Sequence, residues 1–365
     1  MLSAHDYRSP RRANIHFITD ELAKRGRTRF FSLKYSELAR RKGDWRSSLD
    51  AESNQVVRRD GVDCYLWKTW IHPFNTRRPL LYPLESLLHQ WYARGPNPVL
   101  KRWIQEASIV VMESGVAPIF VPLVRRLNPQ ARILYRASDS LKTIDVASYV
   151  QRMFARVASQ FHAICLPSRM LAAEMPDRNN LAFVPHGIDQ QLRARKQPNP
   201  YPPGTHGVSV GSMLFDPQFF VAASRRFPSV QFHIIGCGQP PHKDYGPNVR
   251  VYGEMPFEET LAYIRHADFG IAPYCSNNLP PYLKDTSMKL IQYEFFGIPA
   301  VCPEFVADGY ASRCGYQIGN ADSITAAIET ALATSLDIST SRHLNWSEVT
   351  DRVLYPEHYA DTVIT

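Results

Sequence analysis

The stretch Asp285–Pro303, DTSMKLIQYEFFGIPAVCP, decides the fold class of this chain. Thr286 or Ser287 can cap a helix there and satisfy its free backbone donors. An apolar helical pattern follows and stops at Gly297, a residue that commonly ends helices. A short apolar strand comes next. A helix leading into a buried strand is the unit from which parallel sheets with covering helices are built.

Lys289 falls in the first turn of this predicted helix. The amino-terminal end of a helix is already positive, so a lysine is disfavoured there unless an anion binds between the two charges. A diphosphate fits this requirement. The alternative is a solvated lysine that extends away from an ordinary helix. The spacing alone leaves both interpretations open.

The same alternation of strand and helix patterns runs along the whole chain and predicts an α/β fold. We expect two Rossmann-like, doubly wound domains that face a central cleft. The proline-rich segment RARKQPNPYPPG separates them. The expected boundaries are 1–192 for the N-terminal domain, 193–204 for a linker, 205–343 for the C-terminal domain and 344–365 for a tail that packs back on the first domain.

The charge is distributed unevenly over the 365 residues. Residues 1–185 hold 29 Lys+Arg against 16 Asp+Glu, and the remainder holds 13 against 18. A basic half favours nucleic acid, an anionic membrane or a phosphate-bearing substrate. The six cysteines form no C-x-x-C pair, which excludes zinc ribbons and thioredoxin chemistry. The first residues lack the apolar core of a secretory signal, and no apolar run has the ~20 residues that span a bilayer.

The predicted strands of the second domain each end near a residue suited to nucleotide binding. Met213 ends a Gly-Ser-Met loop whose small residues let backbone N–H groups approach a phosphate. Glu254 can accept from ribose hydroxyls or cap a helix, and Tyr274 can contact a base or close the core. Lys289 and Gln292 lie one helical turn apart on one face. A Gly-Cys-Gly segment at 236–238 is interpreted as a tight turn and not as a nicotinamide site.

Asp139 is the candidate general base of the first domain. A predicted strand delivers it in the sequence Tyr-Arg-Ala-Ser-Asp, where its carboxylate can deprotonate a sugar hydroxyl. It can instead cap the following helix or pair with Arg136. Asp189 and Asp216 are competing carboxylates. No Asp-x-Asp clamp, His-x-x-x-His pair with an acidic partner, P-loop or Gly-x-Ser-x-Gly turn is present, so the sequence predicts no metal site.

The segment Pro79–Tyr92 is apolar and aromatic, and Arg77 and Arg78 precede it. Further arginines crowd the first fifty residues. Such a segment can lie in the interface of an anionic membrane with its leucines buried, since each basic residue near anionic lipid contributes ~1 kcal/mol. The alternative is an ordinary core helix.

Several segments resemble those of a known family: SAHDYRSPRRANIHFITD, HPFNTRR, YRASD, VGSMLFDP, VYGEM, GIAPY, SMKLIQYEFFGIPAVCP and LNWS. They span nearly the whole chain and are similar to GT-B fold glycosyltransferases, most closely to the glucuronosyltransferases of xanthan-type exopolysaccharide assembly. Retaining GT-B relatives carry two glutamates where this chain has Lys284 and Gln292. The missing carboxylate pair fits an inverting subclass.

The resemblance implies transfer of glucuronic acid from UDP-glucuronate to the terminal mannose of a polyprenyl-diphosphate-linked oligosaccharide, with a β-1,2 bond. It implies a peripheral location at the cytoplasmic face of the bacterial inner membrane, no cofactor and no metal. Asp139 falls on the family's proposed base. The expected UDP contacts fall on Met213, Glu254, Tyr274, Met288, Lys289 and Gln292.

Two alternatives remain from the sequence. The first is a GT-B glycosyltransferase with another nucleotide-sugar donor. The second is a non-enzymatic membrane or nucleic-acid adaptor that uses the basic half; because no RNA-binding motif accompanies the charges, nucleic acid is not expected as a partner. The resemblance also predicts a fuller first strand than Met1–Leu2 supplies, so either that strand is nearly absent or the true start lies upstream.

Overall fold

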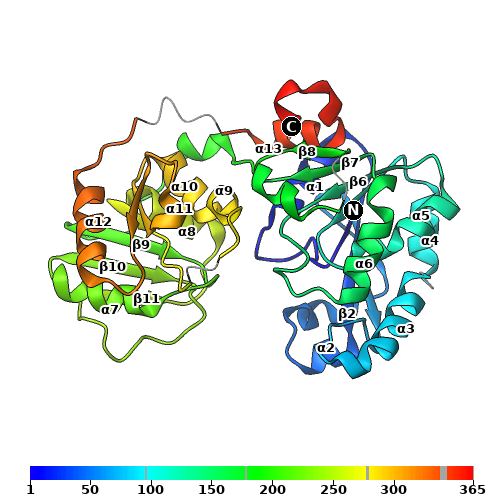
Figure 1. Cartoon of the computed structure of the whole chain (residues 1–365), viewed down its shortest axis with the longest axis horizontal. Coiled ribbons are helices and arrows are strands. Elements are labelled where there is room, and N and C mark those ends of the chain that lie inside the picture. Colours follow the sequence, from blue (N-terminus) through cyan, green and yellow to red (C-terminus); the bar gives the residue numbers. More distant parts are fainter. Residues whose placement is uncertain (95–96, 177–178, 277–278, 338–342, 365) are drawn as a thin grey trace. The chain divides into compact units, whose positions relative to one another are not determined.

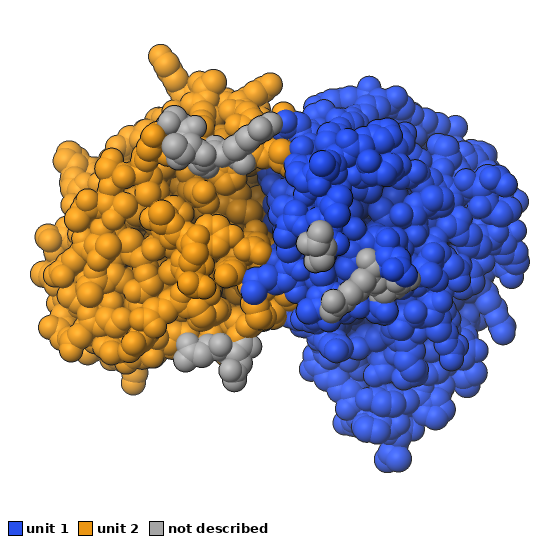
Figure 2. Space-filling view, turned by 45° about the horizontal axis from the view of Figure 1, so that its top comes forward, with its two compact units in different colours: residues 1–187, 346–365 blue, residues 188–345 orange. Residues whose placement is uncertain are grey.

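The computed structural model describes residues 1–94, 97–176, 179–276, 279–337 and 343–364. The chain forms two compact units, residues 1–187 with 346–365 and residues 188–345 (Figure 2). The proline-rich segment, residues 193–204, packs on the second unit and is part of it. Arg193 donates to the backbone oxygen of Phe295 at 3.0 and 2.7 Å, and Tyr201 stacks on His206 with ring centroids 4.3 Å apart.

The first unit is built on a sheet with strand order β3-β4-β2-β1-β5-β6-β7-β8 (Figure 1). Every pair is parallel except β3 with β4. The order reverses at β1, which pairs with both β2 and β5. The strands are β1 (Leu2–Ser3), β2 (Thr28–Ser36), β3 (Val56–Arg59), β4 (Val62–Thr69), β5 (Ile109–Glu113), β6 (Arg132–Arg136), β7 (Ala163–Leu166) and β8 (Leu181–Phe183).

Seven α-helices of the described residues belong to this unit: α1 (Asn14–Arg25), α2 (Glu37–Arg41), α3 (Tyr82–Ala93), α4 (Pro98–Gln105), α5 (Val121–Leu127), α6 (Ser148–Val157) and α13 (Trp346–Leu354). Short 3-10 turns include Trp45–Glu52, Pro79–Leu81 and Ala117–Phe120. The C-terminal helix α13 packs on α1, where the rings of Phe17 and Trp346 stack at 4.7 Å and Arg25 pairs with Asp351.

The second unit repeats the architecture with an all-parallel sheet in the order β11-β10-β9-β12-β13-β14. Its strands are β9 (Thr205–Val210), β10 (Val230–Ile235), β11 (Val249–Tyr252), β12 (Phe269–Ile271), β13 (Ala300–Pro303) and β14 (Arg313–Tyr316). Its helices are α7 (Pro217–Arg226), α8 (Phe257–His266), α9 (Leu283–Thr286), α10 (Met288–Phe296), α11 (Glu304–Ala307) and α12 (Ala321–Ala333).

Two hydrophobic clusters cover the two faces of this second sheet. Phe219 of α7 and Ile328 of α12 belong to one cluster, and Leu261 of α8 and Leu290 of α10 belong to the other. Successive strand residues alternate between the clusters, as the period of a strand requires. The strand order reverses between β9 and β12, and ligands of such folds bind at the carboxyl ends of strands around that point.

Three local features go beyond the expectations from the sequence. The segment 117–127 is a 3-10 turn followed by α5, because Pro118 and Pro122 have no N–H to donate. The hairpin of β3 and β4 was not predicted, although Asp60 and Gly61 form its turn with φ of 46° and 81° and are a strong hairpin signal. The first strand is present as Leu2–Ser3 in the centre of the sheet.

Candidate functional site

Helix α10 is held against the second sheet by Tyr293. Its ring covers Gly270 of β12, where an added Cβ would lie 2.3 Å from the ring. Its hydroxyl lies 3.2 Å from the backbone oxygens of both Val208 and Ile271. Gly297 ends the helix in the left-handed conformation, with φ of 75°, as the sequence predicted. The contact fixes the amino-terminal end of α10 beside the ends of β9 and β12.

The amino-terminal end of α10 lacks the side-chain cap that the sequence predicted. Ser287 occupies the N-cap position, but its hydroxyl bonds to the Tyr274 hydroxyl at 2.7 Å and accepts no backbone N–H. The prediction that Thr286 or Ser287 caps the helix is therefore wrong. Tyr274, which is 1% exposed, competes successfully for that hydroxyl. The first-turn N–H groups keep their capacity to bind an anion.

Lys289 lies in this first turn with an unusual environment. Its Nζ is buried and has no hydrogen-bond partner within the part of the chain that the structure describes. Burial lowers the pKa of the ammonium to about 8. Its Nζ lies 5.4 Å from the centroid of the Tyr274 ring, a contact that favours the cation. The interpretation as a solvated surface lysine is wrong, because the nitrogen is enclosed.

The remaining predicted nucleotide contacts lie along the same edge of the second sheet. Met213 follows β9 and is 56% exposed, and Phe215 beside it forms a bridge with Tyr274 after β12. Glu254 follows β11, with its Cγ 3.7 Å from the position of a Cβ on Gly236 at the end of β10. Met288 and Gln292 belong to α10; Gln292 is 9% exposed. The structure therefore assembles these residues on one edge, while their contacts with UDP stay a prediction.

The two competing carboxylates of the sequence analysis both have local structural roles. Asp216 is the N-cap of α7 and accepts from the backbone N of Gln218 at 2.9 Å; burial raises its pKa. Asp189 is the N-cap of a 3-10 turn and accepts from the backbone N of Gln191 at 2.9 Å. Asp189 also pairs with Arg195 at 3.4 Å. These bonds give both aspartates a structural role, and a part in catalysis stays an untested prediction for either of them.

Asp139 follows β6 at the carboxyl edge of the first sheet, in a segment fixed by Ser114. The Ser114 hydroxyl donates to the backbone oxygen of Asp139 at 3.0 Å and accepts from the backbone N of Ser138 at 2.9 Å. Ser138 in turn donates to Glu113 at 3.0 Å. Glu113 is 2% exposed and also accepts from Ser3 at the end of β1. Residues from three strand ends thus hold the backbone that presents Asp139.

The structure decides one of the two structural alternatives for Asp139, the helix cap. Helix α6 begins at Ser148 and has Ala147 at its N-cap without any side-chain bond, so Asp139 does not cap that helix. The Arg136 guanidinium is fully buried and donates to Val184 O at 2.5 Å and Pro185 O at 3.4 Å. Burial lowers the pKa of Arg136 to about 10.

The sequence analysis missed Ser114, Glu113 and the Tyr274–Ser287 bond. Glu113 and Ser114 stand at the end of a predicted strand, the same position that identified Asp139. Their position was therefore a usable signal. The bond between Tyr274 and Ser287 had no sequence signal, because it joins different elements in the fold.

Within the described ranges, no group of three or more His, Cys, Asp or Glu side chains is arranged to hold a metal ion. No helix among those residues is long and apolar enough to cross a membrane. The expectation of a metal-independent reaction stays a prediction.

Solved structures with the same architecture are glycosyltransferases and related enzymes. A trehalose-phosphate synthase (UDP-forming) from Burkholderia xenovorans superposes with a TM-score of 0.66 at 12% identity, covering 98% of this chain and 99% of that one. A glycosyltransferase involved in avilamycin A biosynthesis has a TM-score of 0.54 at 12% identity, covering 98% and 96%. The fold of two Rossmann-like units is that of the GT-B glycosyltransferases, as predicted.

Sequence comparison is more specific. Residues 1–167 match the family model of the glucuronosyltransferase GumK, N-terminal domain. Over 362 residues the chain is 56% identical to a UDP-glucuronate:glycolipid 2-beta-glucuronosyltransferase of Xanthomonas campestris pv. campestris, covering 99% of this chain and 90% of the relative. The chain belongs to the GumK family of glucuronosyltransferases.

Proposed function

We propose that this enzyme moves glucuronic acid from UDP-glucuronate to the terminal mannose of a polyprenyl-diphosphate-linked oligosaccharide and forms a β-1,2 bond. The name of the Xanthomonas relative supports the donor, the glycolipid acceptor and the linkage. The single structural observation that supports donor binding is the buried, unpartnered Nζ of Lys289 at the open end of α10. A buried cation without a partner is costly, and a diphosphate would satisfy it.

The reaction is a single displacement with inversion. Asp139 takes the proton from the acceptor hydroxyl, whose oxygen forms a bond to the anomeric carbon of the donor. The bond between that carbon and the diphosphate oxygen breaks, and UDP leaves with the electron pair. General base catalysis of this kind contributes typically ~10²–10⁴-fold. The Ser114 and Glu113 bonds give Asp139 a fixed backbone from which to act.

Lys289 and the first-turn N–H groups of α10 stabilise the negative charge that develops on the leaving diphosphate. Fixed donors and cations in a water-excluded position are effective because they need no reorganisation when the charge appears. These groups would supply the charge stabilisation that a divalent ion provides in other transferases. We therefore propose a metal-independent reaction.

Helix α3 supports the proposal of peripheral binding to an anionic membrane at the cytoplasmic face of the inner membrane. Its solvent-facing stripe is apolar: Leu84 is 66% exposed, Leu87 62% and Trp91 44%. Its buried face carries Glu85 and His89, so the usual amphipathic pattern is inverted. An apolar stripe that faces outward is the arrangement of an interfacial helix, in contrast to the alternative of a core helix.

The first test is a donor panel on a lipid-linked mannose acceptor. Radiolabelled UDP-glucuronate should be transferred, and UDP-glucose should be transferred poorly. Equal or better transfer from another UDP-sugar would favour the alternative of a GT-B enzyme with a different donor. Salt-sensitive RNA binding without any UDP affinity would favour the adaptor.

The second test replaces the proposed base. Asp139→Asn should lower turnover by about 10²–10⁴-fold while UDP binding persists. Asp216→Asn is the matched control, because asparagine also caps helices and turnover should stay within a few-fold of wild type. Full activity of Asp139→Asn would remove Asp139 from the mechanism.

A further inference from the structure

Lys34 occupies a strained position at the carboxyl end of β2. Its φ is 58°, in the left-handed region, and the pairing of β2 with β4 shifts register between Ser32 and Tyr35. Such strain in a bulky residue persists only when the surroundings enforce it. Here the backbone N of Lys34 donates to the Tyr92 hydroxyl of α3 at 3.0 Å. The distortion fixes the direction in which the lysine leaves the strand.

Arg46 also holds the backbone of β2 in this distorted conformation at Lys34. Its guanidinium donates to the backbone oxygens of Leu33 at 3.0 Å, Lys34 at 2.9 Å and Ala4 at 3.1 Å. Its remaining donors bind the Asp44 carboxylate at 3.0 and 2.7 Å. All five N–H groups of the guanidinium are therefore used within the protein. Arg46 positions Lys34 and keeps no donor for a ligand.

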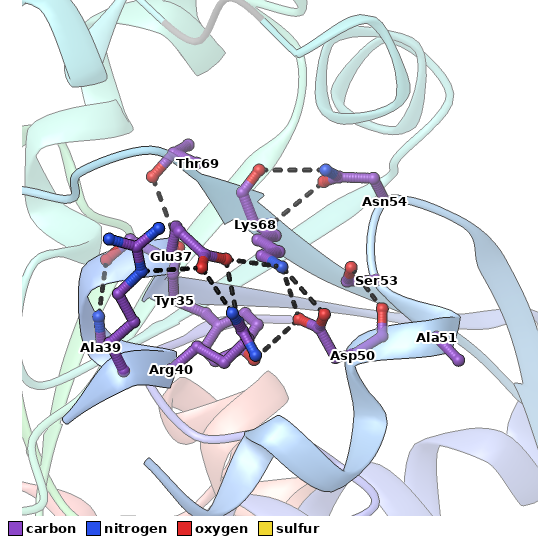
Figure 3. Close-up of polar contacts among 12 residues, drawn as sticks. Tyr35, Glu37, Ala39, Arg40, Asp50, Ala51, Ser53, Asn54, Lys68 and Thr69 are labelled. Carbon is purple, nitrogen blue, oxygen red and sulfur yellow. Dashed lines mark hydrogen bonds and ion pairs between the residues drawn. The ribbon is translucent and has the colours of Figure 1, made fainter. Parts of the chain in front are cut away.

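The charge of Lys34 is not balanced by a neighbouring acid. Its ammonium has no hydrogen bond or ion pair in the described part of the chain, and burial together with Arg46 lowers its pKa. Lys68 on the adjacent β4 is a clear contrast. Figure 3 shows its ammonium between two carboxylates, 2.7 Å from Asp50 and 3.1 Å from Glu37. The protein thus neutralises one lysine at this sheet edge and leaves the other available.

His72 adds an uncharged donor beside Lys34. Burial, Lys34 and Arg46 lower its pKa to about 4, so the ring is neutral. Its Nδ1 lies 2.9 Å from the Ser36 hydroxyl, which itself accepts from the backbone N of Ala39. The Ser36 hydroxyl can donate to Nδ1, and in that tautomer the other ring nitrogen, Nε2, carries the proton and can donate to a ligand.

Lys34 lies against the buried face of helix α3. Tyr92, which accepts from the backbone of Lys34, is on the buried face of α3, and the pKa of His89 on that face is lowered by burial and, to a lesser extent, by the Lys34 charge. The opposite face of α3 carries the exposed Leu84 and Leu87. A cation under an interfacial helix is suited to an amphiphile whose anionic group follows directly after an apolar chain.

We propose that Lys34, with His72 as a second donor and Arg46 as a positioning residue, binds the diphosphate of the polyprenyl-linked acceptor. The inference rests on the proposed function for the identity of the acceptor. Lys34 lies near the carboxyl end of β2 and Asp139 follows β6, with β1 and β5 between the two strands. Three strand spacings of about 4.8 Å separate the two positions by roughly 14 Å. A short oligosaccharide spans that distance, so its far end would reach the base while its diphosphate stays at Lys34.

The headgroup of a bulk phospholipid is a weaker match for this site. Surface cations such as Arg78, which is exposed next to Pro79, are available to headgroups at the membrane plane. Lys34 is half-buried, and its ammonium is already partly desolvated. A diphosphate carries more charge than a single phosphodiester and offsets that desolvation better.

The test uses the full chain and farnesyl diphosphate, a short polyprenyl diphosphate, measured by calorimetry. Lys34→Gln should weaken its binding at least tenfold, and Lys34→Arg should retain most of it. Lys101→Gln on α4 is the control for general charge and should bind as wild type. Sedimentation with phosphatidylglycerol vesicles forms the second arm, and Lys34→Gln should change it by less than twofold. UDP-glucuronate binding should be unaffected.

The outcomes separate this proposal from its rivals. Unchanged farnesyl diphosphate binding in Lys34→Gln overturns it, as does an equal loss in Lys101→Gln. Loss of vesicle binding without loss of diphosphate binding would assign Lys34 to lipid headgroups and also overturns it. Because the diphosphate assay needs no donor and no turnover, failure of the donor panel would reject the proposed function without altering this result.

Discussion

Replacing Lys289 by methionine should stabilise the free protein while it weakens UDP binding. The two side chains have similar length, but methionine needs no partner in a buried position. Burial of the ammonium lowers the pKa of Lys289 from 10.5 to about 8. Because a tenfold change in proton affinity corresponds to about 1.4 kcal/mol, the charged lysine costs the folded state at most about 3–4 kcal/mol. Lys289→Met removes that cost.

The assay is calorimetric unfolding with and without UDP. At about 2–4 °C per kcal/mol for a unit of this size, Tm should rise by several degrees in the variant. UDP should raise the Tm of the wild type and leave that of Lys289→Met nearly unchanged. Loss of charge-assisted bonds worth about 1.5–3 kcal/mol should weaken UDP binding about 10–100-fold. An unchanged or lower Tm together with normal UDP binding would refute the assignment of Lys289 as a buried diphosphate ligand.

The pH dependence of the stability and of UDP binding tests the same assignment of Lys289 independently. The folded-state pKa is below the unfolded one, so the destabilisation by Lys289 is fully present below pH 8 and is relieved between about pH 8 and 10.5. The stability advantage of Lys289→Met should therefore disappear across that window. UDP affinity of the wild type should fall roughly tenfold from pH 7 to 9, because the ligand binds the protonated lysine. The residual affinity of Lys289→Met should not change in parallel.

Three further variants examine the packing of α10 on its sheet and the exposed leucines of α3. Gly270→Ala should destabilise the second unit by about 1–3 kcal/mol, because the new Cβ would lie 2.3 Å from the Tyr293 ring; UDP binding should fall with it. Gly253→Ala, with nothing within 4 Å of the new Cβ, should leave Tm unchanged, and equal Tm values for the two variants would contradict the packing argument. The double variant Leu84→Ser and Leu87→Ser should reduce sedimentation with phosphatidylglycerol vesicles at least fivefold without loss of UDP binding, whereas undiminished sedimentation would show that α3 is not the docking helix.

Much of the fold could be predicted because local patterns and tertiary packing agree. The expected alternation of strands and helices is present in both units. Short apolar runs followed by Gly predict strands, and capping residues predict where helices start, so local sequence determines most of these elements. The hairpin of β3 and β4 was missed although its Asp-Gly turn is a local signal.

For the candidate site too, some features follow from the sequence and others only from the tertiary structure. The sequence by itself determined that chemistry-bearing residues follow successive strands, because the alternation of strand and helix places every strand's carboxyl end on one edge of a parallel sheet. It could not determine which hydrogen bonds those residues form. The tertiary structure alone decided that Ser287 bonds to Tyr274 and leaves the helix end open. It also decided that Lys289 is enclosed and that Lys34 has no acidic partner in the described chain. These are contacts between distant elements, and only packing in three dimensions creates or denies them.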